Sequence, residues 1–157
     1  MPIRIVQGDI TEATEHTICH QVNCQGRMKS GVAAAIRKKW PRVYTDYKDW
    51  LEIFKKRNES PLGTNSLTFT DDGKLIVNMF AQDNYGYDGR RYTSYDAFWL
   101  CLNKIKYYAA KDTSIAFPYG IGCGLGGANW HIIYTMIEEV LSKDYDITLY
   151  KLKEIEE

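Results

Sequence analysis

Residues 117–127 read FPYGIGCGLGG, and this glycine-rich stretch is the most informative segment of the sequence for the fold. An apolar run at 114–117 precedes it, which is typical of a buried strand, and apolar residues at helical spacing follow it: Trp130, Ile133, Ile137, Val140 and Leu141. A loop in this position holds successive backbone amides at the positive end of a helix, where they bind a phosphate without a lysine. The other interpretation is a tight connection that uses glycine for positive φ and binds nothing.

A dinucleotide-binding fold is a competing interpretation, because residues 122–127, GCGLGG, match the pattern GxGxxG. That pattern belongs to the first strand and helix of a long, doubly wound sheet. Only 30 residues follow Gly127, which is too few for the remaining strands and a substrate domain. The position of the motif therefore argues against a nicotinamide-dependent dehydrogenase.

A second loop, residues 23–31 with the sequence NCQGRMKSG, stands in the same relation to its neighbours. An apolar strand at 17–22 precedes it, and a helix beginning near Val32 follows. Two such loops facing one cleft suit a diphosphate with attached sugars better than a lone phosphate. Within this loop, Arg27 and Lys29 either contribute to anion binding or are ordinary solvated surface charges.

The remaining segments alternate between strand and helix patterns. Strands are predicted at 3–6, 66–69, 75–80 and 147–150, with an Asp-Gly hairpin turn at 71–73 and a helix at 43–56 after Pro41. Another helix starts with the capping-box pattern Thr93-Ser-Tyr-Asp96 and places Phe98, Leu102, Ile105 and Ala109 on one face. This order predicts one α/β domain over residues 1–157, with three layers (α/β/α), a mixed, mostly parallel six-stranded sheet, and ligands at the carboxyl ends of its strands.

The composition limits the partners of this domain. Twenty Lys and Arg residues balance twenty Asp and Glu residues, so there is no strong nucleic-acid signal and no pull toward an anionic membrane. The start of the chain lacks a signal-peptide pattern, and we expect a cytoplasmic monomer. We also expect no cofactor and no metal, because neither the four cysteines nor the three histidines have ligand spacing: Cys19, Cys24, Cys101, Cys123, His16, His20 and His131.

Four motifs in this order resemble the macro domain family, whose members bind ADP-ribose: GDI at 8–10, VNCQGRMKSGV at 22–32, PYGIGCGLGG at 118–127 and ITLY at 147–150. The similarity covers nearly the whole chain. Within the family, the segments ICHQVNCQG and SGVAAAIRKKWPRVYTDY most resemble the yeast-type ADP-ribose 1''-phosphate phosphatases. The Leu62-Gly63 pair and the NW-x9-EEV pattern near the end add to this resemblance.

The resemblance implies a role for each matching residue. Asp9 and the amide of Ile10 would contact the adenine, and Asn23 would approach the distal ribose. Tyr150 would pack near the adenine, although an aromatic residue there is equally explained as core. The diphosphate would be wrapped by both loops, through Ser30, Gly31, Val32, Gly120, Ile121, Gly122, Cys123, Gly124 and Leu125.

His20 matches a histidine that the phosphatase branch uses in catalysis. From the residues alone, a histidine near the end of a strand is also explained as a satisfied structural group, although histidine is the usual acid or base near neutral pH. Other branches fit less well. Ala33 stands where one glycohydrolase branch has an aspartate, while Gln82 and Gly126 stand where another branch has a lysine and an aspartate.

Three functions stay open at the level of sequence. The leading hypothesis is a metal-independent phosphatase that converts ADP-ribose 1''-phosphate into ADP-ribose and phosphate, with His20 as the catalytic group. The alternatives are a non-catalytic ADP-ribose reader and a hydrolase that removes ADP-ribose from a macromolecule. Residues 81–92 are either a lid that addresses the distal ribose through Asp83, Asn84, Arg90 and Arg91, or a solvated loop held by Tyr85 and Tyr87.

Overall fold

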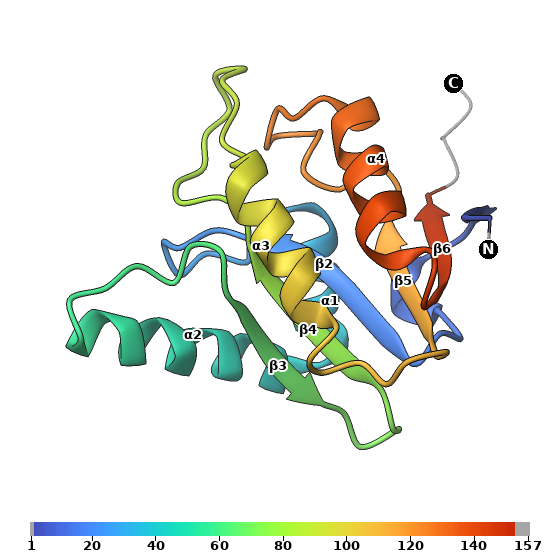
Figure 1. The fold of residues 1–157 in the computed structure, drawn as a ribbon. Coiled ribbons are helices and arrows are strands. Elements are labelled where there is room, and N and C mark those ends of the chain that lie inside the picture. Colours follow the sequence, from blue (N-terminus) through green and yellow to red (C-terminus); the bar gives the residue numbers. More distant parts are fainter. Residues whose placement is uncertain (1, 153–157) are drawn as a thin grey trace, which may run out of the picture.

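The computed structural model describes residues 2–152 and is organised around a six-stranded sheet (Figure 1). The strands are β1 (Arg4–Gln7), β2 (Thr17–Val22), β3 (Asn65–Phe69), β4 (Leu75–Phe80), β5 (Ser114–Pro118) and β6 (Asp146–Lys151). Their order across the sheet is β1-β6-β5-β2-β4-β3. The hairpin pair β3 and β4 is antiparallel and every other neighbouring pair is parallel, which confirms the predicted mixed, mostly parallel sheet.

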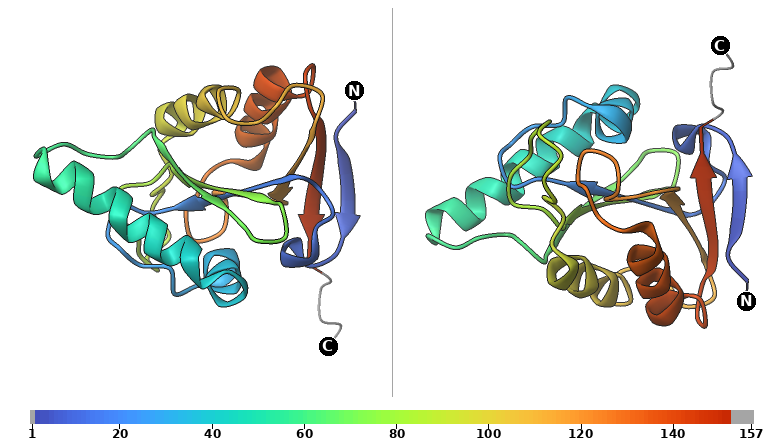
Figure 2. Two further views of the ribbon diagram at one scale, coloured as in Figure 1. Left: turned by 90° about the horizontal axis from the view of Figure 1, so that it is seen from below. Right: turned by 90° about the horizontal axis from the view of Figure 1, so that it is seen from above.

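Two helices cover each face of the sheet, as the two views of Figure 2 show. The helices α1 (Gly31–Lys39) and α2 (Pro41–Lys56) lie on one face, and α3 (Tyr95–Ile105) and α4 (Trp130–Leu141) lie on the other. A short 3-10 helix, η1 (Ile10–Glu12), follows β1. The predicted three-layer α/β/α architecture is therefore confirmed. Within residues 2–152, every helix is too short or too polar to cross a membrane.

Alternating side chains of the central strands divide the core between the two layers. In β4, Val77 packs toward α3 and α4, whereas Ile76 and Phe80 pack toward α1 and α2. All six residues of β4 are buried, as expected for a strand that is covered on both faces. One of them, Asn78, is polar, and it shares the α1 and α2 face with Ile76 and Phe80.

The start of α3 differs from the predicted capping box. Ser94 is the N-cap, and its Oγ accepts a hydrogen bond of 3.1 Å from the Ala97 amide. The Thr93 hydroxyl instead donates to the Gly122 carbonyl at 2.8 Å. The hydroxyl that the capping-box pattern placed at the helix N-terminus therefore binds the glycine-rich loop. Two boundaries also shift: α2 begins at Pro41, a residue that suits the first turn, and Ala109 is buried beyond the end of α3.

The carboxyl ends of the parallel strands meet at one edge of the sheet, and four connecting segments gather there. Residues 8–9 leave β1, residues 23–30 leave β2, residues 81–93 leave β4 and residues 119–129 leave β5. We call residues 23–30 loop 1, residues 82–92 the middle loop and residues 119–127 loop 2. In Figure 1, the middle loop rises beside loop 2 above the sheet.

Candidate functional site

Two adjoining cavities open between the loops at this edge. The inner cavity, of about 260 Å³, lies between the start of α1 and loop 2, and His20 forms part of its wall. The outer cavity, of about 350 Å³, lies between loop 1 and the middle loop. They form one continuous cleft, because both are lined by Gln21, Ser30, Ala33, Gln82 and Leu125.

The start of α1 leaves its first amides free toward the inner cavity. Ser30 is the N-cap residue but makes no capping hydrogen bond, and its Oγ lies 3.2 Å from the hydroxyl oxygen of Tyr87 in the middle loop. By contrast, the side chains of Ser94 and Asn129 cap α3 and α4. Within residues 2–152, no acceptor is found for the first-turn amides of Gly31, Val32 and Ala33.

Loop 2 contributes a second group of free amides. Four of its amides are paired within the fold: Tyr119 donates to Tyr150 of β6, and the amides of Ile121, Cys123 and Gly127 close turns. Five others have no acceptor in the described part of the chain: those of Gly120, Gly122, Gly124, Leu125 and Gly126. All five residues line the inner cavity. The inner cavity therefore lies between two sets of unpaired N–H groups, which is the chemistry of an anion site.

His20 lies in the wall of this cavity with only 1% of its surface exposed. Its Nε2 forms a hydrogen bond with Oδ1 of Asn78, whereas its Nδ1 is buried and has no partner among the described residues. Burial lowers the pKa of the ring to about 4, and the bond to Asn78 opposes that shift. The imidazole is therefore neutral at pH 7 and presents one unused nitrogen.

The buried neutral state of His20 predicts a loss of stability below pH 6.5. The pKa is about 4 in the folded chain against an ordinary value of 6.5, so between these values the unfolded chain binds a proton that the folded chain does not. The contribution of this group is fully present above pH 6.5 and falls by up to about 3 kcal/mol as the pH drops to 4. Urea unfolding at pH 7 and pH 4 should show a larger drop for the wild type than for His20→Gln. Equal drops would contradict the prediction.

Asn23 lines the outer cavity, but its side chain mainly shapes loop 1. Its Oδ1 accepts from the Gln25 amide at 2.9 Å, and its Nδ2 donates to the Arg27 carbonyl at 3.0 Å. The buried Tyr47 hydroxyl donates to the Asn23 carbonyl at 2.6 Å and accepts from the Gly26 amide at 3.0 Å. Loop 1 therefore leaves one Nδ2 hydrogen of Asn23 unused, and the predicted contact with a distal ribose would have to use that hydrogen.

The residues predicted to contact adenine lie at the same edge but line neither cavity. Asp9 caps η1, with its Oδ1 accepting from the Thr11 amide at 2.9 Å, and Ile10 is buried in the core. The hydroxyl of Tyr150 donates to the Glu15 carboxylate. Cys123 is also absent from the lining, and burial raises the pKa of its thiol. The other predicted residues of the two loops do line the cleft.

Sequence reasoning missed a polar cluster at the base of the middle loop. Nε2 of Gln21 donates to Oε1 of Gln82 at 2.7 Å and to Oγ1 of Thr93 at 2.8 Å, and Thr93 in turn donates to Gly122. The three side chains join β2, the middle loop and loop 2. Gln21, a polar residue one position before the end of a buried strand, was the available signal. This cluster fixes the position of loop 2 above the inner cavity.

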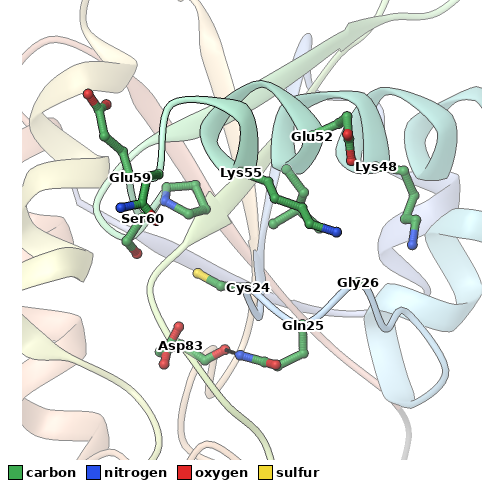
Figure 3. Close-up of a pocket in the computed structure, with 12 residues that line it drawn as sticks. Cys24, Gln25, Gly26, Lys48, Glu52, Lys55, Glu59, Ser60 and Asp83 are labelled. Carbon is green, nitrogen blue, oxygen red and sulfur yellow. Dashed lines mark hydrogen bonds between the residues drawn. The ribbon is translucent and has the colours of Figure 1, made fainter.

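A third cavity, of about 600 Å³, lies behind loop 1 and against α2 (Figure 3). Its wall mixes Lys48 and Lys55 with Glu52, Glu59 and Asp83, so it favours neither sign of charge. The thiol of Cys24 lies between loop 1 and this wall in Figure 3, and burial, with Asp83 adding to it, raises its pKa to about 12. This thiol is protonated at neutral pH and is not a nucleophile.

Metal ligands are not gathered at any point of the described chain: residues 2–152 hold no group of three His, Cys, Asp or Glu side chains able to bind a metal ion. The lining of the cleft offers backbone amides, amide side chains, hydroxyls, the imidazole of His20, and the charged side chains of Arg27 and Lys29 in the outer cavity.

Known proteins resemble this chain over nearly its whole length. A model of the family described as Macro domain matches residues 19–137. The human ADP-ribose glycohydrolase OARD1 is 27% identical over 154 residues, covering 96% of this chain and 91% of the relative. A DNA ADP-ribosyl glycohydrolase of Mycobacterium bovis is 26% identical over 148 residues, which cover 91% of this chain and 40% of that longer protein. A solved structure of a Bacteroides thetaiotaomicron protein of unknown function superposes with a TM-score of 0.80 at 29% identity, covering 97% of this chain and 99% of the other.

Proposed function

Because the chain belongs to the macro domain family, we propose that its cleft binds ADP-ribose and hydrolyses ADP-ribose 1''-phosphate to ADP-ribose and phosphate. One observation supports this above the others: the unpaired amides at the start of α1 and in loop 2 flank the same inner cavity. Such groups neutralise a diphosphate without a buried lysine or arginine. The outer cavity, continuous with the inner one, accommodates the distal ribose and the group that it carries.

The reaction needs one water and the transfer of one proton. Water oxygen bonds to the phosphorus, the bond between phosphorus and the anomeric oxygen breaks, and the sugar leaves with a hydroxyl. The proton lost by water is the one that the leaving oxygen gains. A neutral His20 suits this transfer, because a neutral ring accepts a proton from water and returns it to the leaving group. Its unpaired Nδ1 is buried in the structure, so this step requires the cavity wall to admit water to that atom. Loop amides that face the phosphate stabilise its charge in the transition state.

Removal of ADP-ribose from a macromolecule is a second candidate, favoured by the names of the human and mycobacterial relatives. The side chains in the cleft argue against the lysine-adduct route, since Gln82 occupies the position of that lysine and Gly126 that of the aspartate. Gln82 is further committed to Gln21 at 2.7 Å. If the chain performs this reaction, it does so without an amine nucleophile at that position.

The test measures binding and turnover on the same preparation in buffer with a chelator. We expect calorimetry to show one ADP-ribose site, and phosphate release from ADP-ribose 1''-phosphate to proceed over many turnovers with ADP-ribose as a competitive inhibitor. Binding without phosphate release would overturn the phosphatase proposal and leave a reader. Release of ADP-ribose from modified DNA or protein, with no phosphate release, would favour the second candidate.

A further inference from the structure

Three polar side chains form one row across the centre of the sheet. The strand register pairs His20 of β2 with Asn78 of β4, and Asn78 with Ser66 of β3. All three are at most 2% exposed, and they lie on the face that α1 and α2 cover. Nε2 of His20 contacts Oδ1 of Asn78, and Nδ2 of Asn78 donates to Oγ of Ser66 at 2.9 Å.

This row determines which ring nitrogen of His20 carries the proton. In the structure Nδ2 of Asn78 donates to Ser66 and its Oδ1 faces the ring, and an amide oxygen only accepts. The partner of that oxygen, Nε2 of His20, must therefore carry the hydrogen. In a neutral imidazole the other nitrogen, Nδ1, then has a lone pair. Ser66 thus anchors the amide that contacts the ring, without touching the ring itself.

We propose that Asn78 and Ser66 are positioning residues, which hold His20 in the Nε2–H tautomer so that Nδ1 is the proton-accepting nitrogen of the ring. The chemical part of this inference rests on the proposed function, whereas the tautomer does not. A purely structural histidine would have both nitrogens paired, because an unpaired buried acceptor is unfavourable. Here the unpaired Nδ1 is itself buried, in a ring that forms part of the wall of the inner cavity.

The neighbouring residues support a specific role for the row. Asn78 is the polar residue in the otherwise apolar strand LIVNMF, and both faces of that strand are buried. An apolar side chain at this position would pack between Ile76 and Phe80, which are fully buried in the same cluster. An amide there, oriented by a serine on the next strand, gives the imidazole a fixed direction in place of this packing.

The experiment uses two isosteric changes on the same strand and face. Ser66→Ala removes the group that orients Asn78, whereas Thr68→Val removes an equally buried hydroxyl that bonds Asp46 at 2.6 Å and does not belong to the row. Nitrogen-15 spectra of the imidazole should show the Nε2–H tautomer in the wild type and in Thr68→Val, and a mixture in Ser66→Ala. Turnover of ADP-ribose 1''-phosphate should fall roughly fivefold in Ser66→Ala with KM unchanged, because the loss of one buried hydrogen bond shifts the tautomer equilibrium by about that factor.

Two further variants test Asn78 itself. Asn78→Asp keeps an acceptor for Nε2–H and should keep the tautomer, whereas Asn78→Leu should lose it together with most of the turnover. A Nδ1–H tautomer in the wild type, or an unchanged spectrum in Ser66→Ala and Asn78→Leu, would overturn the inference. The expected tautomers in a wild type that releases no phosphate would instead sustain the positioning of His20 and refute the phosphatase proposal.

Discussion

Replacement of His20 by alanine should lower turnover of ADP-ribose 1''-phosphate by roughly a hundredfold or more, as expected for the loss of a general acid or base. The affinity for ADP-ribose should stay nearly the same, because the proposed diphosphate contacts come from backbone amides of α1 and loop 2. Turnover and affinity should respond differently because the ring, whose Nδ1 is unpaired and whose Nε2 is held by Asn78, takes part in the reaction and not in diphosphate binding. Phosphate release and calorimetry on one preparation measure the two effects.

The alanine variant also leaves Oδ1 of Asn78 without its partner in a buried position, and this lowers stability. His20→Gln is therefore made in parallel, since its side-chain amide donates to Asn78 but transfers no proton. His131→Ala, which removes an exposed histidine at the start of α4, serves as the matched control. Turnover in His20→Gln equal to that of the wild type would refute the role of the ring.

The fold was predictable because its main elements are local patterns. Apolar runs, an Asp-Gly turn and glycine loops that each link a strand to a helix predicted the β2-to-α1 and β5-to-α4 units, and the parallel strand pairs brought both loops to one edge. The free amides follow from the same patterns. Glycine at Gly120, Gly122 and Gly124 removes the side chain, and the first turn of α1 has no partner for its own N–H groups.

The side-chain network of the site was less predictable, because it depends on which residues of different strands stand opposite one another. Nothing local to His20 indicates that Asn78, 58 residues later, is its neighbour. The sequence predicted that Asn23 lies at the cleft, but not that its side chain takes part in the hydrogen bonds of loop 1, because these involve Tyr47 of α2. Thr93 was assigned to a helix cap, whereas loop 2 takes its hydroxyl. In each case a distant partner decides the role of a polar side chain.

The sequence does not distinguish the glycines of loop 2, but the structure separates those where a Cβ would clash with backbone from those where it would meet no atom. At Gly127, φ is +72°, and a Cβ would lie 2.7 Å from the Arg90 carbonyl oxygen and 3.0 Å from Cα of Arg91. Both contacts are with backbone of the middle loop, which cannot move like a flexible side chain. At Gly124, φ lies outside the left-handed range and a Cβ would meet nothing within 4 Å, although the residue lines the inner cavity.

Gly127→Ala should therefore lower the free energy of unfolding by about 3 kcal/mol or more, from backbone strain and the clash together. Gly73→Ala is the matched control for strain alone, because Gly73 has φ of +84° in the hairpin turn and no atom near its Cβ position. It should cost roughly 1 kcal/mol and leave ADP-ribose binding unchanged. Urea unfolding of the two variants measures the difference, and equal losses would show that the middle loop does not press on Gly127.

Gly124→Ala should have the opposite signature. Its unfolding free energy should stay within about 0.5 kcal/mol of the wild type, because the added methyl has free space and an ordinary backbone. Its affinity for ADP-ribose should fall roughly tenfold, since a phosphate held by the amides of Gly122 and Gly124 must approach the backbone as closely as only glycine allows. A stable Gly124→Ala variant with unchanged affinity would mean that the diphosphate does not lie on loop 2. The glycine run would then serve the fold alone, and the binding proposal would rest on α1.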